Sequence, residues 1–278
     1  MRRTFVILSL LLSLIATITS ASAERKVIDI STRSGVKQRI LLISAPDPKA
    51  AVILFAGNHG GLQIDDSGRL RRGSRNFLVR SAHLFAAQGL TVAFIDAASD
   101  RLSPPYLSGF RLSSEHAADV KAVIAWLRDQ TGAPVWLIGT SRGTQSVGAV
   151  STALRAAGGP DGIVLTSTIF TDPRSTPVPD MNIETLSIPV LVVHHELDAC
   201  RVCLFRDMPR LMGKLSAVPR KELITFRGGE NHGDPCEALA YHGFNGVEED
   251  VVGRIAAWII QQPRAKALSH CAVCQRPL

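Results

Sequence analysis

The stretch WLIGTSRGTQS, residues 136–146, decides the fold, because an apolar run ends there in a serine between two glycines. A serine that ends a buried parallel strand and opens a helix lies at the edge where α/β sheets place their ligands. The turn must be very sharp, so a side chain at Gly139 or Gly143 would collide with neighbouring backbone. The pattern therefore predicts a strand, a tight turn that presents the hydroxyl of Ser141, and a helix.

Short apolar, β-branched runs alternate with amphipathic segments on both sides of this stretch. The predicted strands are 39–43, 51–55, 91–95, 135–138, 162–166, 190–194 and 222–226. The predicted helices are 74–89, 113–132, 142–159, 206–218 and 246–262. This alternation predicts an α/β fold, with a mostly parallel central sheet and helices on both faces. Segment 171–187 lies between two predicted strands and is too short for a large lid, so any cap is expected to be small.

The sequence GTSRG, residues 139–143, resembles the G-x-S-x-G nucleophile elbow of the α/β-hydrolase superfamily, in the strand–turn–helix setting that the motif requires. The resemblance in element order covers residues 27–262, and the short cap is similar to that of dienelactone hydrolases. It implies an α/β-hydrolase fold in which Ser141 is the nucleophile and Gly139 and Gly143 form the elbow.

The resemblance also implies an oxyanion hole with two backbone donors. One is the residue after the nucleophile, Arg142, and the other comes from the glycine-rich loop after an early strand. Aligning FAGN with the family pattern makes Asn58 the second donor. The usual histidine of that loop is replaced by Ala56, and His59 is displaced. The other interpretation of this loop is an ordinary glycine-rich turn.

The family order places an acid and then a histidine after the nucleophile. Asp198 follows the strand at 190–194 and is the expected acid, with Glu196 as the second candidate. His194 and His195 stand at the end of that strand, where an exposed imidazole could line the site without catalysing.

Two histidines are candidates for the base between the last strand and the last helix. His242 stands in HGF, which resembles the approach to the last helix in many family members, and is favoured over His232 on this context. The residues GDPCEALAY between them read as an insertion. If Cys236 pairs with Cys200 or Cys203, the bond would tie this insertion to the acid loop.

Residues 1–23 have the basic start, apolar stretch and small residues before Glu24 that are typical of a secretory signal peptide. Cleavage after Ala23 would leave a hydrolase domain at 24–262 and a tail at 263–278. The protein is therefore expected to be exported, periplasmic or secreted. A retained membrane anchor is the alternative.

The five cysteines are Cys200, Cys203, Cys236, Cys271 and Cys274. Export favours disulfide bonds for them, and a Cys271–Cys274 loop is expected in the C-terminal tail. The two C-x-x-C pairs could also bind zinc, but export favours disulfide bonds over a zinc site, so no metal is expected. The odd number leaves one thiol free or paired between chains.

The net charge of +7 falls to +5 without the signal peptide, because Arg2 and Arg3 leave and no acidic residue goes with them. The remaining basic residues are scattered without interleaved aromatics, which argues against a nucleic-acid-binding face. Arg101, Arg111 and Arg142 are expected to be solvated surface residues, with contacts to an anionic substrate as the alternative.

Together these residues predict an exported serine hydrolase that cleaves a carboxylic ester or related acyl substrate through an acyl-enzyme on Ser141. An acyltransferase or peptidase with the same triad, or a non-catalytic binding protein on the same scaffold, are the alternatives. The chemistry needs no cofactor, and the expected partner is a small acyl compound, without nucleic acid or stable membrane insertion.

Overall fold

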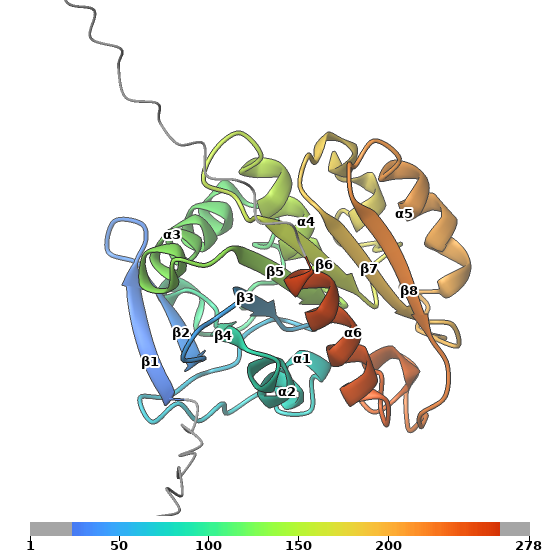
Figure 1. Ribbon diagram of the computed structural model, residues 1–278, viewed down its shortest axis with the longest axis horizontal. Helices are drawn as coiled ribbons and strands as arrows, with labels where there is room; N and C mark the ends of the chain where they lie inside the picture. Colours follow the sequence, from blue (N-terminus) through green and yellow to red (C-terminus); the bar gives the residue numbers. More distant parts are fainter. Residues whose placement is uncertain (1–23, 262–278) are drawn as a thin grey trace, which may run out of the picture.

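The computed structural model describes residues 24–261, which form one eight-stranded sheet with helices on both faces (Figure 1). The strands are β1 (Glu24–Ser31), β2 (Lys37–Ser44), β3 (Ala50–Phe55), β4 (Leu90–Ile95), β5 (Val135–Thr140), β6 (Gly162–Thr166), β7 (Val190–His195) and β8 (Lys221–Phe226). Their order across the sheet is β1-β2-β4-β3-β5-β6-β7-β8. The β1–β2 and β2–β4 pairs are antiparallel and all others are parallel, as the alternation of strands and helices predicts.

Two groups of helices cover the two faces of the sheet (Figure 1). The helices α3 (Ser114–Thr131), α4 (Gly143–Ala153) and α5 (Met208–Lys214) pack on one face, and α1 (Phe77–Arg80), α2 (Ala82–Ala87) and α6 (Glu248–Ile260) pack on the other. Within residues 24–261, five short 3-10 helices lie in the connections: η1 (Ser99–Arg101), η2 (Val178–Asp180), η3 (Ile183–Thr185), η4 (Phe205–Asp207) and η5 (Tyr241–Gly243).

Central strands are buried on both faces, which is why they read as unbroken apolar runs. In β3, Ile53 and Phe55 point into the core beneath α3 and α4, whereas Val52 and Leu54 point into the core beneath α1, α2 and α6. The alternation follows from the two-residue period of a strand. All parallel strands from β3 to β7 therefore end at one edge, where the loops of the site begin.

All seven predicted strands are confirmed, with ends within two residues of those expected. The sequence missed β1, because this edge strand has mostly exposed or half-buried residues and charged residues at its start. The prediction of a single helix at 74–89 is wrong, because two short helices, α1 and α2, occupy this segment. The chain bends at Ser81 between α1 and α2, and helical structure begins only after Asn76, whose side chain accepts a hydrogen bond from the amide of Leu78.

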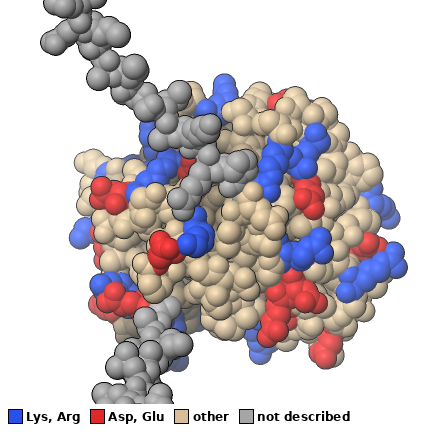
Figure 2. Space-filling model, viewed as in Figure 1, with Lys and Arg blue, Asp and Glu red and all other residues tan. Residues whose placement is uncertain are grey.

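The segment 171–187 packs into the core and forms no large cover over the sheet edge. Its apolar residues Val178, Met181, Ile183 and Leu186 join the core beneath α4. On the face drawn in Figure 2, basic and acidic residues are interspersed and no basic stripe is formed. None of the helices within residues 24–261 has the length and apolar character needed to cross a membrane.

Candidate active site

Ser141 occupies a sharp turn between β5 and α4. Its φ of +52° lies in the left-handed region, which non-glycine residues adopt only where the surroundings hold them there. Both flanking glycines are required by close backbone contacts. A Cβ on Gly143 would lie 2.1 Å from the carbonyl oxygen of Phe55, and one on Gly139 would lie 2.6 Å from the backbone of Gly143. The turn therefore has the geometry that the G-x-S-x-G pattern predicts.

The loop after β3 runs beside this turn. A Cβ on Gly57 would lie 3.0 Å from the Cβ of Ser141, so the two backbones approach closely. Asn58 has a φ of +52°. Within residues 24–261, the backbone N–H groups of Asn58 and Arg142 have no hydrogen-bond acceptor. Two free N–H groups beside a serine hydroxyl are what an oxyanion hole requires.

The side chain of Arg111 holds this loop by hydrogen bonds to its backbone, a role that the sequence did not indicate. The expectation of a solvated or substrate-binding Arg111 is wrong, because its guanidinium is buried. It donates to the carbonyl oxygens of Ala56 (3.2 Å) and Asn58 (3.1 Å) and to Oγ of Ser146 (2.8 Å). Burial, with a smaller effect of Arg142, lowers the pKa of Arg111 to about 9, so the side chain is still charged at neutral pH.

Arg101 and Arg142, which were expected to be solvated or to contact substrate, also have partners in the protein. The guanidinium of Arg101 lies 4.6 Å from the ring centroid of Phe110. Arg142 forms an ion pair with Asp172, whose side chain is fully buried. The amide of Gln145 donates to the same carboxylate at 3.1 Å.

Asp198 and His242 form a buried pair. Nδ1 of His242 donates to Oδ2 of Asp198 at 2.9 Å, and the other oxygen of this carboxylate accepts from the amide of Cys200 at 2.9 Å. The carbonyl oxygen of His242 accepts from Oγ of Ser167 at 2.6 Å, which fixes the backbone of this histidine. Nε2 of His242 is buried and has no hydrogen-bond partner among the described residues. The imidazole is thus oriented by its Nδ1 and has its Nε2 free.

The competing candidates lie elsewhere. His232 is exposed and contacts Glu230, with 3.0 Å between its Nε2 and the carboxylate. Glu196 accepts a hydrogen bond from Thr225 at 2.8 Å and pairs with Arg227, which holds the pKa of the Glu196 carboxyl below its usual value.

Two other histidines at the end of β7 are buried, so the expectation that they are exposed in the site is wrong. Nε2 of His194 lies 2.7 Å from the carbonyl oxygen of Cys203 and 3.5 Å from Oδ2 of Asp198. Burial lowers the pKa of His194 to about 4. The ring of His195 stacks on Tyr241 with 4.4 Å between centroids. Both side chains position the loops around the Asp198–His242 pair.

A disulfide joins Cys200 to Cys236 and ties the loop of Asp198 to the loop that precedes His242. Cys203 is a free, buried thiol. Burial, and to a smaller extent the negative charge of Asp198, raises the pKa of this thiol well above its usual value. The Cys271–Cys274 pair and the signal peptide of the sequence prediction lie outside the described residues.

One cavity of about 600 Å³ collects these groups. Its lining includes Asn58, Ser141, Arg142 and His242, together with the disulfide. Its other charged residues are Arg75, Arg174, Arg201 and Glu237. These three arginines have no ion-pair partner among residues 24–261. The cavity therefore carries an excess of positive charge.

His59, which the loop alignment left displaced, has a structural role. Its Nδ1 accepts from the amide of Gly61 at 3.1 Å, and its ring stacks on Tyr106 at 4.5 Å. Burial, together with Arg72 and Arg111, lowers the pKa of His59.

No family model and no curated protein sequence matches this chain. Solved structures do. The α/β serine hydrolase XC6422 from Xanthomonas campestris, described as lacking a lid, is 17% identical with a TM-score of 0.56, over 86% of this chain and 97% of that one. The esterase Pf2001 from Pyrococcus furiosus is 13% identical with a TM-score of 0.60, over 86% of this chain and 91% of that one.

A dienelactone hydrolase from Anabaena variabilis is 12% identical with a TM-score of 0.59, and the match covers 87% of this chain and 100% of that one. Identities this low show the fold alone. The mostly parallel eight-stranded sheet with helices around it matches the fold of these neighbours, as the resemblance of the sequence predicted. The chain has the α/β-hydrolase fold.

Proposed function

We propose that the protein is an exported serine hydrolase that cleaves a carboxylic ester or related acyl substrate. The observation that carries this proposal is the convergence of three features on one cavity. They are a strained, half-buried serine that lines the cavity, a buried Asp198–His242 pair with its Nε2 free, and two free backbone N–H groups. The solved neighbours, which include esterases, support the same class of chemistry.

The proposed first step is attack of Oγ of Ser141 on the acyl carbon. Nε2 of His242 takes the hydroxyl proton, and Asp198 holds Nδ1–H and stabilises the imidazolium. The amides of Asn58 and Arg142 donate to the oxyanion, where one such donor contributes about 3 kcal/mol. His242 then protonates the departing alcohol, and Ser141 is left as an acyl-enzyme. Water, deprotonated by His242, releases the acid and restores the hydroxyl.

In the free protein, Nε2 of His242 has no hydrogen bond to the Ser141 hydroxyl or to any other group among the described residues. Catalytic hydrogen bonds often tighten only when substrate binds, so this arrangement is compatible with the proposed role.

A fluorophosphonate probe tests the proposal without knowledge of the substrate, because it reacts with an activated serine. We expect the intact mass of the purified protein to rise by one adduct and that of Ser141→Ala to stay unchanged. Folding of both proteins is checked by near-UV circular dichroism. A folded wild-type protein that gains no adduct would identify a binding protein on a hydrolase scaffold.

A further inference from the structure

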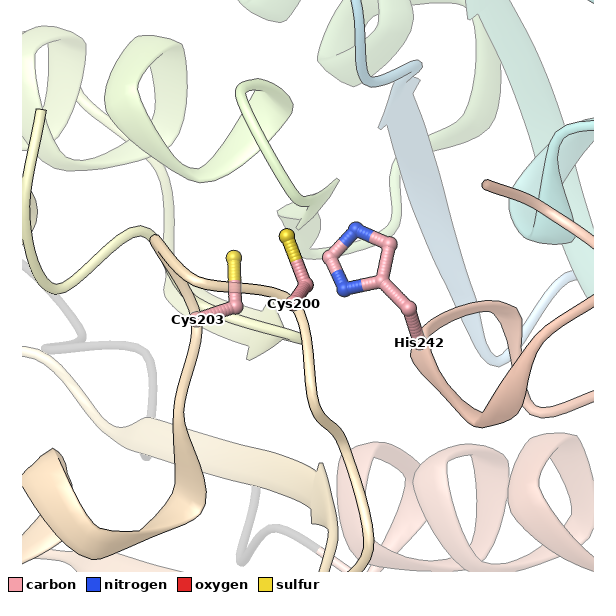
Figure 3. Close-up of side chains that lie close together, drawn as sticks. All are labelled: Cys200, Cys203 and His242. Carbon is pink, nitrogen blue, oxygen red and sulfur yellow. The ribbon is translucent and has the colours of Figure 1, made fainter. Parts of the chain in front are cut away.

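Three side chains with metal-binding atoms meet beside the candidate nucleophile. The sulfurs of Cys200 and Cys203 and a ring nitrogen of His242 all lie within 4.8 Å of one another, and all three residues are buried (Figure 3). They come from two loops, one after β7 and the other at η5. Two sulfurs and an imidazole form a ligand set that suits Zn²⁺ and other borderline or soft metals, in contrast to Mg²⁺ or Ca²⁺.

The availability of this ligand set depends on one bond. Cys203 is a free thiol and Nε2 of His242 has no partner, but Cys200 is bonded to Cys236. The oxidised protein therefore offers two ligands. A phosphine or dithiol reductant that supplies two electrons cleaves the sulfur–sulfur bond, and two protons from solvent convert the sulfurs into the thiols of Cys200 and Cys236. The phosphine leaves as its oxide, with oxygen from water, or the dithiol leaves as its disulfide.

We propose that reduction of the Cys200–Cys236 disulfide creates a Zn²⁺ site formed by Cys200, Cys203 and His242. Binding releases one proton from each of the two thiols, because thiolates are the ligands. Tetrahedral zinc with Zn–S bonds of about 2.3 Å holds its two sulfurs about 3.8 Å apart. The observed sulfur–sulfur separation, within 4.8 Å, thus needs to shorten by about 1 Å at most. The fourth position is left for water in the cavity.

Asp198 supplies the outer contact that such a site needs. A histidine that binds zinc through one nitrogen usually donates its other ring N–H to a carboxylate or carbonyl. Nδ1 of His242 already donates to Asp198 at 2.9 Å, so Nε2 is the nitrogen left for the metal. The orientation that suits a general base equally suits a zinc ligand.

Zinc at this position would occupy the nitrogen that accepts the proton of Ser141. Reduction in the presence of Zn²⁺ would therefore stop hydrolysis, and this consequence rests on the proposed function. The binding of metal does not rest on it, so binding is measured by a readout that requires no activity.

Co²⁺ titration provides that readout, because tetrahedral Co²⁺ with thiolate ligands has a charge-transfer band and intense visible bands. All proteins carry Cys271→Ser and Cys274→Ser, so that thiols outside the described residues do not contribute. The matched variants are Cys236→Ser, which leaves all three ligands unbonded, and Cys203→Ser, which removes one. Each protein is titrated with Co²⁺ twice, once in the presence of the reductant tris(2-carboxyethyl)phosphine and once in its absence.

We expect Cys236→Ser and the reduced parent to bind one Co²⁺ per chain with thiolate bands that Zn²⁺ abolishes. The oxidised parent should show none. Reduced Cys203→Ser should bind more weakly by a factor larger than the about 10–100-fold that removal of an outer partner costs. Native near-UV circular dichroism without thiolate bands, in both Cys236→Ser and the reduced parent, overturns the inference. Unfolding of both forms overturns it as well, because the site requires the folded loops.

Fluorophosphonate labelling separates this inference from the proposed function. An adduct on the oxidised parent, together with absent cobalt bands, would leave the hydrolase and remove the metal site. Cobalt bands without any adduct would leave the metal site and remove the hydrolase. If both hold, Zn²⁺ should block the adduct on Cys236→Ser and leave labelling of the oxidised parent unchanged.

Discussion

The Asp198 carboxylate and the His242 imidazole are joined at 2.9 Å across 44 residues of sequence, and the Cys200–Cys236 disulfide links the same two loops. His242 of this pair lines the same cavity as Ser141, so residues from three separate segments meet at one sheet edge. Because His242 contacts Asp198 and His232 does not, single substitutions of His242 and His232 can show which of the two histidines is the base.

Replacement of His242 by alanine should lower the rates of ester hydrolysis and fluorophosphonate labelling by about 10²–10⁴-fold, because the serine loses its proton acceptor. His232→Ala should leave both rates unchanged, since the exposed side chain of this histidine pairs with Glu230 and does not line the cavity of Ser141. Both rates are measured on proteins with matched circular dichroism. Equal loss in the two variants would contradict the assignment of His242.

Gly143→Ala should destabilise the protein by about 1–3 kcal/mol or more and abolish labelling of Ser141, because its Cβ would lie 2.1 Å from the Phe55 oxygen. Gly213 in α5 is the matched control, since nothing lies within 4 Å of a Cβ there. Gly213→Ala should raise the free energy of unfolding by about 0.4–1 kcal/mol. Urea unfolding measures both, and similar effects at the two positions would refute the close contact.

Acidification should destabilise the fold through its buried histidines. Burial lowers the pKa of His194 to about 4 and that of His116 to about 3, both from 6.5. The unfolded chain therefore binds protons first as the pH falls, and stability is lost progressively from pH 6.5 towards pH 4. Each histidine contributes at most about 1.4 kcal/mol per pH unit.

The variant His194→Asn tests this effect, because it should reduce the slope of unfolding free energy against pH between pH 6.5 and 4. His83→Asn, at an exposed position on α2, serves as the control and should keep the wild-type slope. Urea titrations across this range provide the slopes. An undiminished slope in His194→Asn would show that its burial does not control acid stability.

Esters that carry a negative charge should be preferred over neutral esters of equal length, because Arg75, Arg174 and Arg201 line the cavity without ion-pair partners. A hemisuccinate and a butyrate ester of the same alcohol make the comparison. The double variant Arg174→Ala/Arg201→Ala should raise KM for the hemisuccinate about 3–10-fold and leave the butyrate unaffected.

The control for this charge effect is Arg155→Ala, which removes an exposed arginine at the opposite edge of the sheet. It should change neither KM. The preference should also decline as salt concentration rises, because exposed charges are screened. A preference independent of salt would point to shape, not charge, as its origin.

Much of the fold could be predicted from the sequence because buried parallel strands and amphipathic helices have different periods. The tight turn at Ser141 was also predictable, since only glycine fits at positions 139 and 143. The roles of Arg111 and Asp172 were not, because each depends on partners distant in sequence. A charged residue that is buried against carbonyl groups looks, in sequence, like any surface residue.

The choice between His232 and His242 shows the same limit. Spacing from the last strand allows both, and only the folded loops bring one of them to Asp198. The disulfide partner of Cys200 could not be read from spacing either, because Cys203 and Cys236 were both candidates.

The disulfide also has a consequence for the growing polypeptide. Cys200 and Cys203 emerge from the ribosome together, well before Cys236, so the first partner within reach of Cys200 is the wrong one. In an oxidising compartment, any early bond between them must be exchanged before Asp198 and His242 can be held together. If the protein is exported as proposed, its maturation should therefore depend on a disulfide isomerase more strongly than its single described bridge would suggest.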